Sequence, residues 1–203
     1  IAEHLDWWAK TLGGAPPSST FAPDLEPSGS VAAAVVDFAW GAHLSACVRA
    51  AAASAGATLY MAVVAACAAI LRVHTGQSEV VIGNPTGDRE RTELEAVVGP
   101  FVNVQPLRIQ MDDDPTFTDL MRRTRDVILD AHEHRDVPLE LMLERLKPQR
   151  WADRSPFFQV AVVQHSAEQR SAIDIAGGGA LHDMTLFFRE VEGRIVGNVE
   201  YRA

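Results

Sequence analysis

Apolar residues recur at helical spacing in several segments of the chain. In Ala2–Gly13, the apolar side chains three or four positions apart share one face, which predicts a helix that ends at a pair of glycines. The same spacing predicts further helices over His43–Ser54, Thr58–Val73, Thr116–His132 and Pro138–Leu146. We expect Thr58 to cap its helix and Gly76 to close it. Because this helix is apolar on nearly every side, it is predicted to be largely buried.

Runs of β-branched and aromatic residues predict strands between and after these helices. The predicted strands are Ala32–Phe38, Glu79–Ile82, Phe101–Ile109, Phe157–Gln164, Met184–Glu190 and Arg194–Glu200, the last two paired across Glu192-Gly193. Residues Ala15–Ser30 are predicted to be an extended connector, Gly83–Glu93 a loop and Gly177–Gly179 a turn. Strands that alternate with helices and then form a hairpin favour an α/β fold, an α+β sandwich in which helices pack on a mixed β-sheet.

The composition of the chain argues against nucleic acid and membrane as binding partners. The chain has 203 residues, of which 47% are hydrophobic, enough to fill one core. Its net charge is −9 and its 18 Lys and Arg residues are scattered, which argues against nucleic-acid binding. No apolar run reaches the ~20 residues that span a bilayer, so no membrane contact is expected. Cys47 and Cys67 lie in apolar stretches and are predicted to be buried free thiols, which favours the cytoplasm.

The search for catalytic groups finds no complete active site. His132 and Asp136 have the spacing of a base and its orienting carboxylate, but a solvated helix end is the favoured interpretation. His132 and His134 lack a third ligand at zinc spacing, so no metal site is predicted. The acidic run Asp112–Asp114 precedes a predicted helix, where carboxylates favour the helix dipole.

Several blocks nevertheless resemble, in family order, the motifs of nonribosomal peptide synthetase condensation domains. The block Val98–Arg108, V-G-P-F-V-N-V-Q-P-L-R, is similar to that family's I-G-x-F-V-N-T-x-x-x-R. His134–Glu140 looks like H-Q-D-x-P-F-E, and Arg150–Phe157 looks like R-D-x-S-R-N-P-L. The other blocks are Thr75–Gln77 with Val80–Gly83, Pro85 and Arg89; the W-x-x-x-L-G-G-A-P stretch Trp8–Pro16; and Asp183–Leu186, similar to the late F-D-L-T-L strand.

The resemblance implies one lobe of a two-lobed fold like that of chloramphenicol acetyltransferase. Residues 1–203 would form the C-terminal lobe, with 1–30 a helix and linker from the N-terminal lobe and 31–203 the lobe core. In that family, an acceptor amine attacks a donor thioester, and both substrates are carried on phosphopantetheine arms of carrier proteins. The family's central histidine lies in an H-H-x-x-x-D-G motif, which this chain lacks. We therefore expect the N-terminal lobe to precede Ile1 and the chain to be inactive alone.

The resemblance also assigns roles to individual residues, none of them catalytic. Asn103 and Gln105 are expected to line the substrate channel, where the Asn103 amide either orients the substrate or satisfies nearby backbone groups. The expected lobe-bridging or structural residues are Arg89, Arg108, His134, Asp136, Ser155 and Asp183. Among these, the arginines are expected to pair with carboxylates, Asp136 to cap a helix end and Ser155 to shape a turn. No cofactor or metal is expected to bind this chain.

The chain departs from the family pattern at four positions. Val104, Arg135, Leu139 and His182 replace the usual Thr, Gln, Phe and aromatic residue. These changes leave the expected fold intact and the condensation subtype open.

Three functions remain at this point. The first is a part of an amide-forming condensation domain, whose partners are the N-terminal lobe, two peptidyl carrier proteins and an adenylation domain. The second is a catalytically inactive condensation-like module that docks or recruits other proteins, and the third is a free-standing acyltransferase, which the lack of a base disfavours. As an isolated lobe, the chain is expected to self-associate through an exposed apolar face.

Overall fold

The computed structural model describes residues 1–21, 32–87, 97, 99, 102–149, 154–166 and 180–203. The helices are α1 (Ala2–Leu12), α2 (Ala42–Ser54), α3 (Leu59–Thr75), α4 (Phe117–Glu133) and α5 (Leu139–Leu146). The strands are β1 (Ala33–Ala39), β2 (Glu79–Gly87), β3 (Val102–Gln110), β4 (Val160–Gln164), β5 (Met184–Val191) and β6 (Arg194–Arg202).

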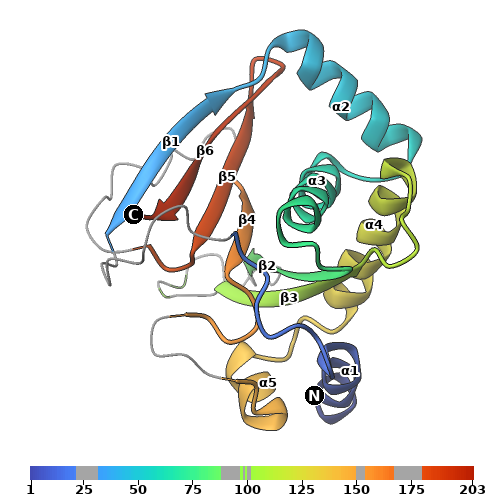
Figure 1. Ribbon diagram of the computed structural model, residues 1–203, viewed down its shortest axis with the longest axis vertical. Helices are drawn as coiled ribbons and strands as arrows, with labels where there is room; N and C mark the ends of the chain where they lie inside the picture. The colour runs from blue at the N-terminus through green and yellow to red at the C-terminus, as the bar shows by residue number, and fades with distance from the viewer. Residues whose placement is uncertain (22–31, 88–96, 98, 100–101, 150–153, 167–179) are drawn as a thin grey trace.

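The strands form one mixed sheet in the order β1-β6-β5-β4-β2-β3 (Figure 1). Strand β4 runs parallel to both β2 and β5, and the other neighbours are antiparallel. The β5–β6 hairpin turns at Glu192 and Gly193, with φ angles of 49° and 74°, the left-handed pair that a tight hairpin with native twist requires. The expected mixed sheet with packed helices is therefore confirmed.

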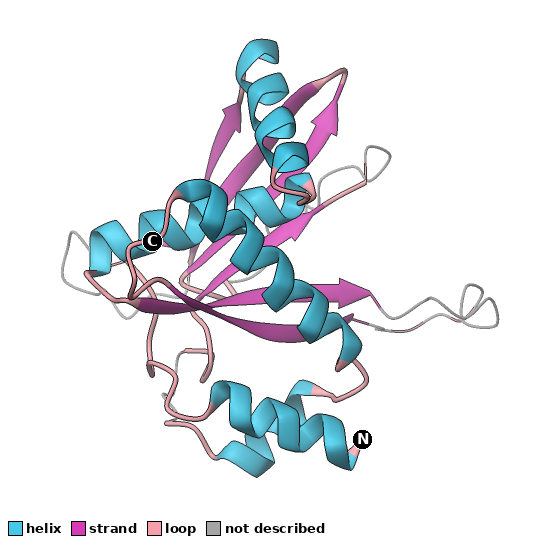
Figure 2. Ribbon diagram, turned by 90° about the vertical axis from the view of Figure 1, so that its right-hand side faces the viewer, coloured by secondary structure: helices cyan, strands magenta, loops and turns pink. Residues whose placement is uncertain are grey.

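The helices cover the two faces of the sheet unequally. Figures 1 and 2 show α2, α3 and α4 on one face, whereas α1 and α5 lie on the other side of β3. Among the described helices, none covers the second face over β1, β6 and β5. The helices therefore leave that face of these three strands open.

Helix α3 lies at the centre of the core. Its residues Val64, Ala65, Ala68 and Leu71 are fully buried, which agrees with the all-round apolar pattern of this helix. Each buried Val or Leu side chain stabilises the fold by roughly 1.5–3 kcal/mol. The Thr58 side chain accepts the backbone N–H of Met61 at 3.2 Å, and Gly76 closes the helix with a φ of 70°, so both predicted end signals are confirmed.

Two strand boundaries differ from the predictions by three residues or more. Strand β2 continues to Gly87, so the predicted loop from Gly83 was wrong over its first five residues, and the remainder lies outside the described residues. The cause is tertiary, because β3 pairs with β2 along its whole length. Strand β4 begins only at Val160, since Phe157 and Phe158 are buried without joining the ladder. The predicted turn at Gly177–Gly179 also lies outside the described residues.

The two cysteines occupy different environments. Cys67 on α3 is 5% exposed, as predicted, but Cys47 on α2 is exposed. The prediction of a buried Cys47 was wrong because α2 packs only one face against the rest of the molecule. Both thiols are free.

Candidate functional site

The Asn103 side chain joins two of the family-like blocks. Its amide donates hydrogen bonds to the carbonyl oxygens of Arg135 (3.2 Å) and Val137 (2.8 Å). Its oxygen accepts the backbone N–H groups of Val104 (3.0 Å) and Leu139 (3.2 Å). Because an asparagine amide offers two donors and two acceptor positions, these bonds use its full capacity. The geometry therefore matches the backbone-satisfying alternative, and an orienting role towards substrate stays a prediction.

Gln105 belongs to a buried polar chain between the sheet and the helices. Its amide donates to the Ala131 carbonyl of α4 at 2.7 Å, and its oxygen accepts from Asn84 at 3.0 Å. The Tyr60 hydroxyl of α3 donates in turn to the Asn84 oxygen. Gln105 is 0% exposed and faces α4, and its expected place in the substrate channel stays a prediction.

No sequence pattern marked Tyr60 and Asn84 as members of this chain. Each lies inside a run of apolar residues, and only the packing of α3 on β2 brings them together. Burial raises the pKa of the Tyr60 phenol well above its ordinary value, with a smaller contribution from Cys67. The phenol is therefore a hydrogen-bond donor at neutral pH and not a base.

His134 ends α4 and contacts α1. Its ring stacks on Trp7 with 4.1 Å between ring centroids, and its Nδ1 lies 2.9 Å from Nδ1 of His4. Its carbonyl oxygen accepts the indole N–H of Trp8 at 2.9 Å. Burial, and then the neighbouring His4, lowers the pKa of His134 below its ordinary value, which favours the neutral ring that a hydrogen-bonded histidine pair needs. His134 therefore attaches the first helix to the end of α4.

The Asp136 side chain does not have the capping role expected of it. The N-cap of α5 is Pro138, no side chain caps this helix, and Asp136 is exposed. Asp136 lies two residues before the N-cap, and its carboxylate is directed to solvent. His132, the other half of the H-x-x-x-D spacing, contacts the Arg135 guanidinium at 2.9 Å. No catalytic pair forms between these positions.

Arg108 is a structural residue that joins β3 to α1. It forms an ion pair with Glu79 of β2 at 2.8 Å, and it donates to the carbonyl oxygens of Thr11 (3.0 Å) and Gly13 (2.9 Å). Its carboxylate partner thus comes from the neighbouring strand. Arg89, for which a similar role was expected, lies outside the described residues.

Ser155 and Asp183 lie near the start of β4 and β5. The Ser155 carbonyl accepts the Gln159 amide at 2.9 Å, and the Gln159 oxygen accepts the backbone N–H of Ser19 at 2.7 Å. Asp183 lies 3.8 Å from the Arg154 side chain and 4.0 Å from Arg202. These contacts lie near the starts of the two strands, and the turn-shaping role expected of Ser155 and the bridging or structural role of Asp183 stay predictions.

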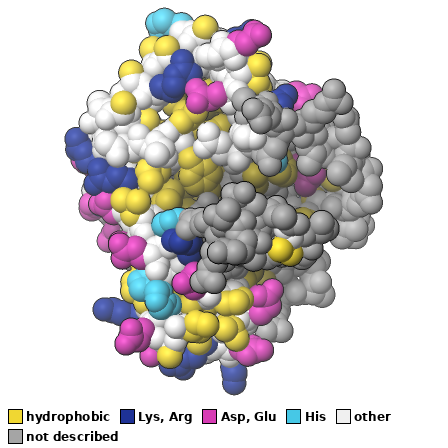
Figure 3. All heavy atoms as spheres, turned by 180° about the vertical axis from the view of Figure 1, so that it is seen from behind, with side chains coloured by type: hydrophobic (Ala, Val, Ile, Leu, Met, Phe, Trp, Pro, Cys, Tyr) yellow, Lys and Arg dark blue, Asp and Glu magenta, His cyan; other side chains and the backbone are white. Residues whose placement is uncertain are grey.

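On the side seen in Figure 3, the described residues show no concentration of one charge sign. Acidic and basic side chains are intermixed there along the border of the molecule, with hydrophobic side chains between them. Among the described residues, no group of three or more His, Cys, Asp or Glu side chains could hold a metal ion. In the same part of the chain, no single helix is long and apolar enough to cross a membrane; α2 and α3 pass such a test only together, across a 98° bend.

Comparison with known proteins identifies the family. A family model described as the condensation domain matches residues 1–202. The chain belongs to the condensation domain family. It is 33% identical to malpinin synthetase of Mortierella alpina, over 99% of this chain and 3% of that protein. It is 30% identical to phosphinothricin tripeptide synthetase PhsC of Streptomyces viridochromogenes, over 99% of this chain and 20% of that protein.

Solved structures support the fold of this condensation domain chain. The X-domain from teicoplanin biosynthesis superposes with a TM-score of 0.88 at 24% identity, over 99% of this chain and 49% of that one. A four-domain nonribosomal peptide synthetase bound to AMP and glycine gives a TM-score of 0.85 at 19% identity, over 98% of this chain and 17% of that one. The chain therefore has the chloramphenicol acetyltransferase-like fold. It spans about half of the X-domain and between 3% and 20% of these three synthetases.

Proposed function

We propose that this chain is the C-terminal lobe of a condensation domain that forms an amide bond in nonribosomal peptide biosynthesis. The match of the condensation family to residues 1–202 carries the proposal. The acceptor amine attacks the thioester carbon of the donor, the new C–N bond replaces the C–S bond, and the amine proton passes through a base to the thiolate. The chain itself requires no cofactor, because both substrates arrive on the phosphopantetheine arms of carrier proteins.

The histidine base of this reaction is supplied by an N-terminal lobe with an H-H-x-x-x-D-G motif. This chain has no such motif, and the histidine that it places in a family block, His134, is held by Trp7 and His4. The Asn103 and Arg108 contacts instead fix β3 against α5 and α1. In this proposal the chain supplies a rigid wall beside the reacting groups.

An amide-formation assay with loaded donor and acceptor carrier proteins tests this proposal. This chain alone is expected to give no product, and this chain with its N-terminal lobe is expected to give the amide. A matched control carries His→Ala in the H-H-x-x-x-D-G motif of the added lobe, and it should give none. Product from this chain alone would refute the assignment of the base to the other lobe.

A docking or recruitment module is the second candidate. It is favoured by the similarity to the teicoplanin X-domain, which has also been solved in complex with OxyB and again superposes with a TM-score of 0.88. If both lobes together give no amide but retain binding to a neighbouring protein in sedimentation velocity, the recruitment function replaces the condensation function.

A further inference from the structure

Two histidines that are 130 positions apart in the sequence lie in direct contact. His4 is on α1 and His134 follows α4, and 2.9 Å separates their Nδ1 atoms. Their rings meet edge to face, at 70° and with 4.8 Å between ring centroids. A hydrogen bond between two ring nitrogens needs one N–H group and one lone pair. This histidine pair therefore has a hydrogen bond only while at least one of the two Nδ1 atoms carries no proton.

The number of protons on the histidine pair decides whether this bond exists. Two neutral rings form it when one ring carries its proton on Nδ1 and the other carries its proton on Nε2. One added proton leaves the bond in place, because the charged ring donates to the neutral one. Two added protons put an N–H group on both Nδ1 atoms, which removes the acceptor and brings two positive charges together. Only the second proton therefore breaks the contact.

The charged groups around the histidine pair offset this repulsion only in part. Asp130 and Glu133 of α4 favour a protonated His134. Burial of the His134 ring, and then the neighbouring His4, act against the proton, and the pKa of His134 falls below its ordinary value of 6.5. Because both of these causes require α1 to be in place, protonation of His134 is easier when the start of α1 has left it.

The second half of α1 is anchored by contacts that do not involve the histidine pair. Trp8 and Leu12 are 0% and 5% exposed, so their side chains belong to the core. Arg108 of β3 donates hydrogen bonds to the carbonyl oxygens of Thr11 and Gly13. Protonation of the two histidines changes none of these groups. The end of α1 is therefore expected to stay attached at acidic pH.

The first half of α1 is held less firmly. Leu5 and Trp7 are only partly buried, and Trp7 stacks on the ring of His134 with 4.1 Å between ring centroids. Asp6 pairs with Arg145 of α5 at 3.2 Å, but both side chains are more than half exposed. An exposed ion pair of this kind contributes little to stability. The hydrogen bond of the histidine pair is thus a large part of what fixes the start of α1.

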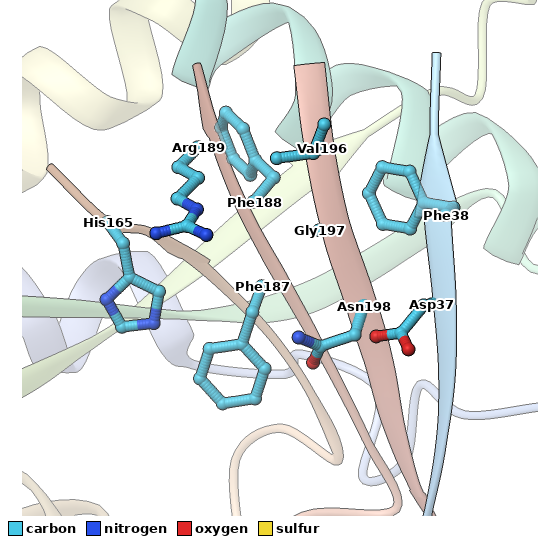
Figure 4. A pocket seen from close by; sticks show the side chains of 9 residues that line it. All are labelled: Asp37, Phe38, His165, Phe187, Phe188, Arg189, Val196, Gly197 and Asn198. Carbon is cyan, nitrogen blue, oxygen red and sulfur yellow. The ribbon is translucent and has the colours of Figure 1, made fainter. Parts of the chain in front are cut away.

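Stacking on an aromatic ring does not by itself make a histidine contact sensitive to acid. His165 stacks on Phe187 with 5.5 Å between ring centroids, and Figure 4 shows the two side chains next to one another in a pocket of the sheet. The face of an aromatic ring attracts a cation, so a proton on His165 leaves such a stack in place. The same holds for His134 on Trp7. The acid-sensitive contact is therefore the one between the two histidines.

We propose that the histidine pair holds the start of α1, Ala2–Trp7, in place at neutral pH and releases it when both rings are protonated. Trp8 and Leu12 keep the rest of the helix attached, so the release is local. It uncovers the ring of His134. Because the second proton is bound more tightly after release, attachment is complete above about pH 6.5 and is lost as the pH falls below it. The proposal does not depend on the condensation function.

NMR of the ¹⁵N-labelled chain between about pH 7.5 and about pH 5.5 tests the proposal. As the pH falls, we expect the {¹H}–¹⁵N heteronuclear NOE to decrease at Leu5, Asp6 and Trp7 and to stay high at Leu12 and along α3. The indole N–H signal of Trp7 reports the released fraction. While this fraction is small, it should rise about tenfold for each pH unit, because release takes up one proton.

Two variants remove the second charge and keep a hydrogen bond. His4→Gln and His134→Gln each replace one ring by an amide that donates and accepts but does not titrate. In both variants, the NOE at the start of α1 should stay high at about pH 5.5. The matched control is His132→Gln, because His132 lies on α4 just before His134 and contacts Arg135 instead. This control should release the start of α1 as the wild-type chain does.

Three results would overturn the proposal. The first is a wild-type NOE at Leu5, Asp6 and Trp7 that does not change down to about pH 5.5. The second is a simultaneous decrease along α3, since this indicates unfolding of the whole chain and not a local release. The third is an equal release in the wild-type chain and in the glutamine variants. If one glutamine variant does not fold, the other decides, because each removes the second charge from the histidine pair.

Discussion

The Asn103 amide bridges β3 and the turn between α4 and α5 through four backbone groups. Asn103→Leu removes all four hydrogen bonds and leaves the carbonyl of Val137, which is itself buried, without its donor. Each buried backbone group left unsatisfied costs roughly 1–3 kcal/mol. We expect the free energy of unfolding in urea to fall by about 2–4 kcal/mol.

Val102→Ala is the matched control for Asn103→Leu, because it changes an adjacent β3 side chain that is 67% exposed. The control should change the free energy of unfolding by no more than about 0.5 kcal/mol. If both substitutions lower the free energy of unfolding equally, the hydrogen bonds of the Asn103 amide do not stabilise the fold.

At the same scale, two histidines make stability depend on pH. Burial lowers the pKa of His134 below 6.5, with the neighbouring His4 acting in the same direction, and burial also lowers the pKa of His182. The unfolded chain then holds these protons more tightly than the folded one. Their contribution to stability is therefore complete above about pH 6.5 and is lost as the pH falls through the lower folded pKa values.

Urea unfolding between about pH 7 and pH 5 measures this dependence. The free energy of unfolding is expected to fall with pH in the wild-type chain and to fall less steeply in His134→Gln. An unchanged slope in that variant would contradict the contribution of His134.

The two thiols should differ in reactivity. Burial raises the pKa of Cys67 to about 12, so this residue carries almost no thiolate near neutral pH, whereas Cys47 is exposed. A thiol-specific reagent such as DTNB is expected to modify one cysteine in the folded chain and both in denaturant. Cys47→Ser should abolish the native-state reaction, and rapid modification of that variant would show that the α3 core opens readily.

At the scale of the element, Gly197 allows β1, β5 and β6 to pack closely. A Cβ built at this position would lie 2.0 Å from the Phe187 carbonyl oxygen and 2.9 Å from the Phe38 ring. Gly197→Ala should therefore destabilise the chain by about 2 kcal/mol or more through overpacking, measured as a lower urea midpoint. Gly87→Ala is the control, because a Cβ there meets no atom within 4 Å. Similar midpoints for both variants would show that the hairpin relaxes around the added methyl group.

At the scale of the whole molecule, the edge strand β1 predicts association. Among the strands that the structure describes it pairs only with β6, and its Val35 and Val36 are 42% and 55% exposed. An exposed apolar edge strand offers unpaired backbone groups to a second chain. Sedimentation velocity should detect concentration-dependent association that Val36→Lys reduces. The control Val73→Lys changes a residue that is 81% exposed on α3 and should have no effect. If the chain is a monomer at every concentration, the prediction that β1 associates with a second chain is wrong.

Most elements of the fold could be predicted from local patterns. Helix α3 was found from its cap at Thr58, its apolar run and the glycine after it, and the β5–β6 hairpin from its turn residues. The end of β2 could not be found in this way, because β3 rather than the β2 sequence extends the strand to Gly87. The prediction that Cys47 is buried was wrong for a related reason. The sequence of an alanine-rich helix does not show which of its faces the rest of the molecule covers.

The candidate site was predictable in part of its membership and not in its contacts, since no pattern marked Tyr60 or Asn84. The motif blocks identified the family and pointed to Asn103 and Arg108, but the partners of these residues come from segments up to 97 positions away. Asp136 and Gln105 show the limit of prediction from motifs, because the position of a residue in a motif does not tell whether its side chain faces solvent or the core.

The sequence by itself determined the family, the kinds of secondary structure and the absence of an H-H-x-x-x-D-G motif within these residues, since each of these depends on local order along the chain. Only the tertiary structure decided that Tyr60, Asn84 and Gln105 form one buried chain, and that His4 and His134 lie in contact. Strand register and helix packing set these neighbours, and both follow from burying apolar surface across the whole chain.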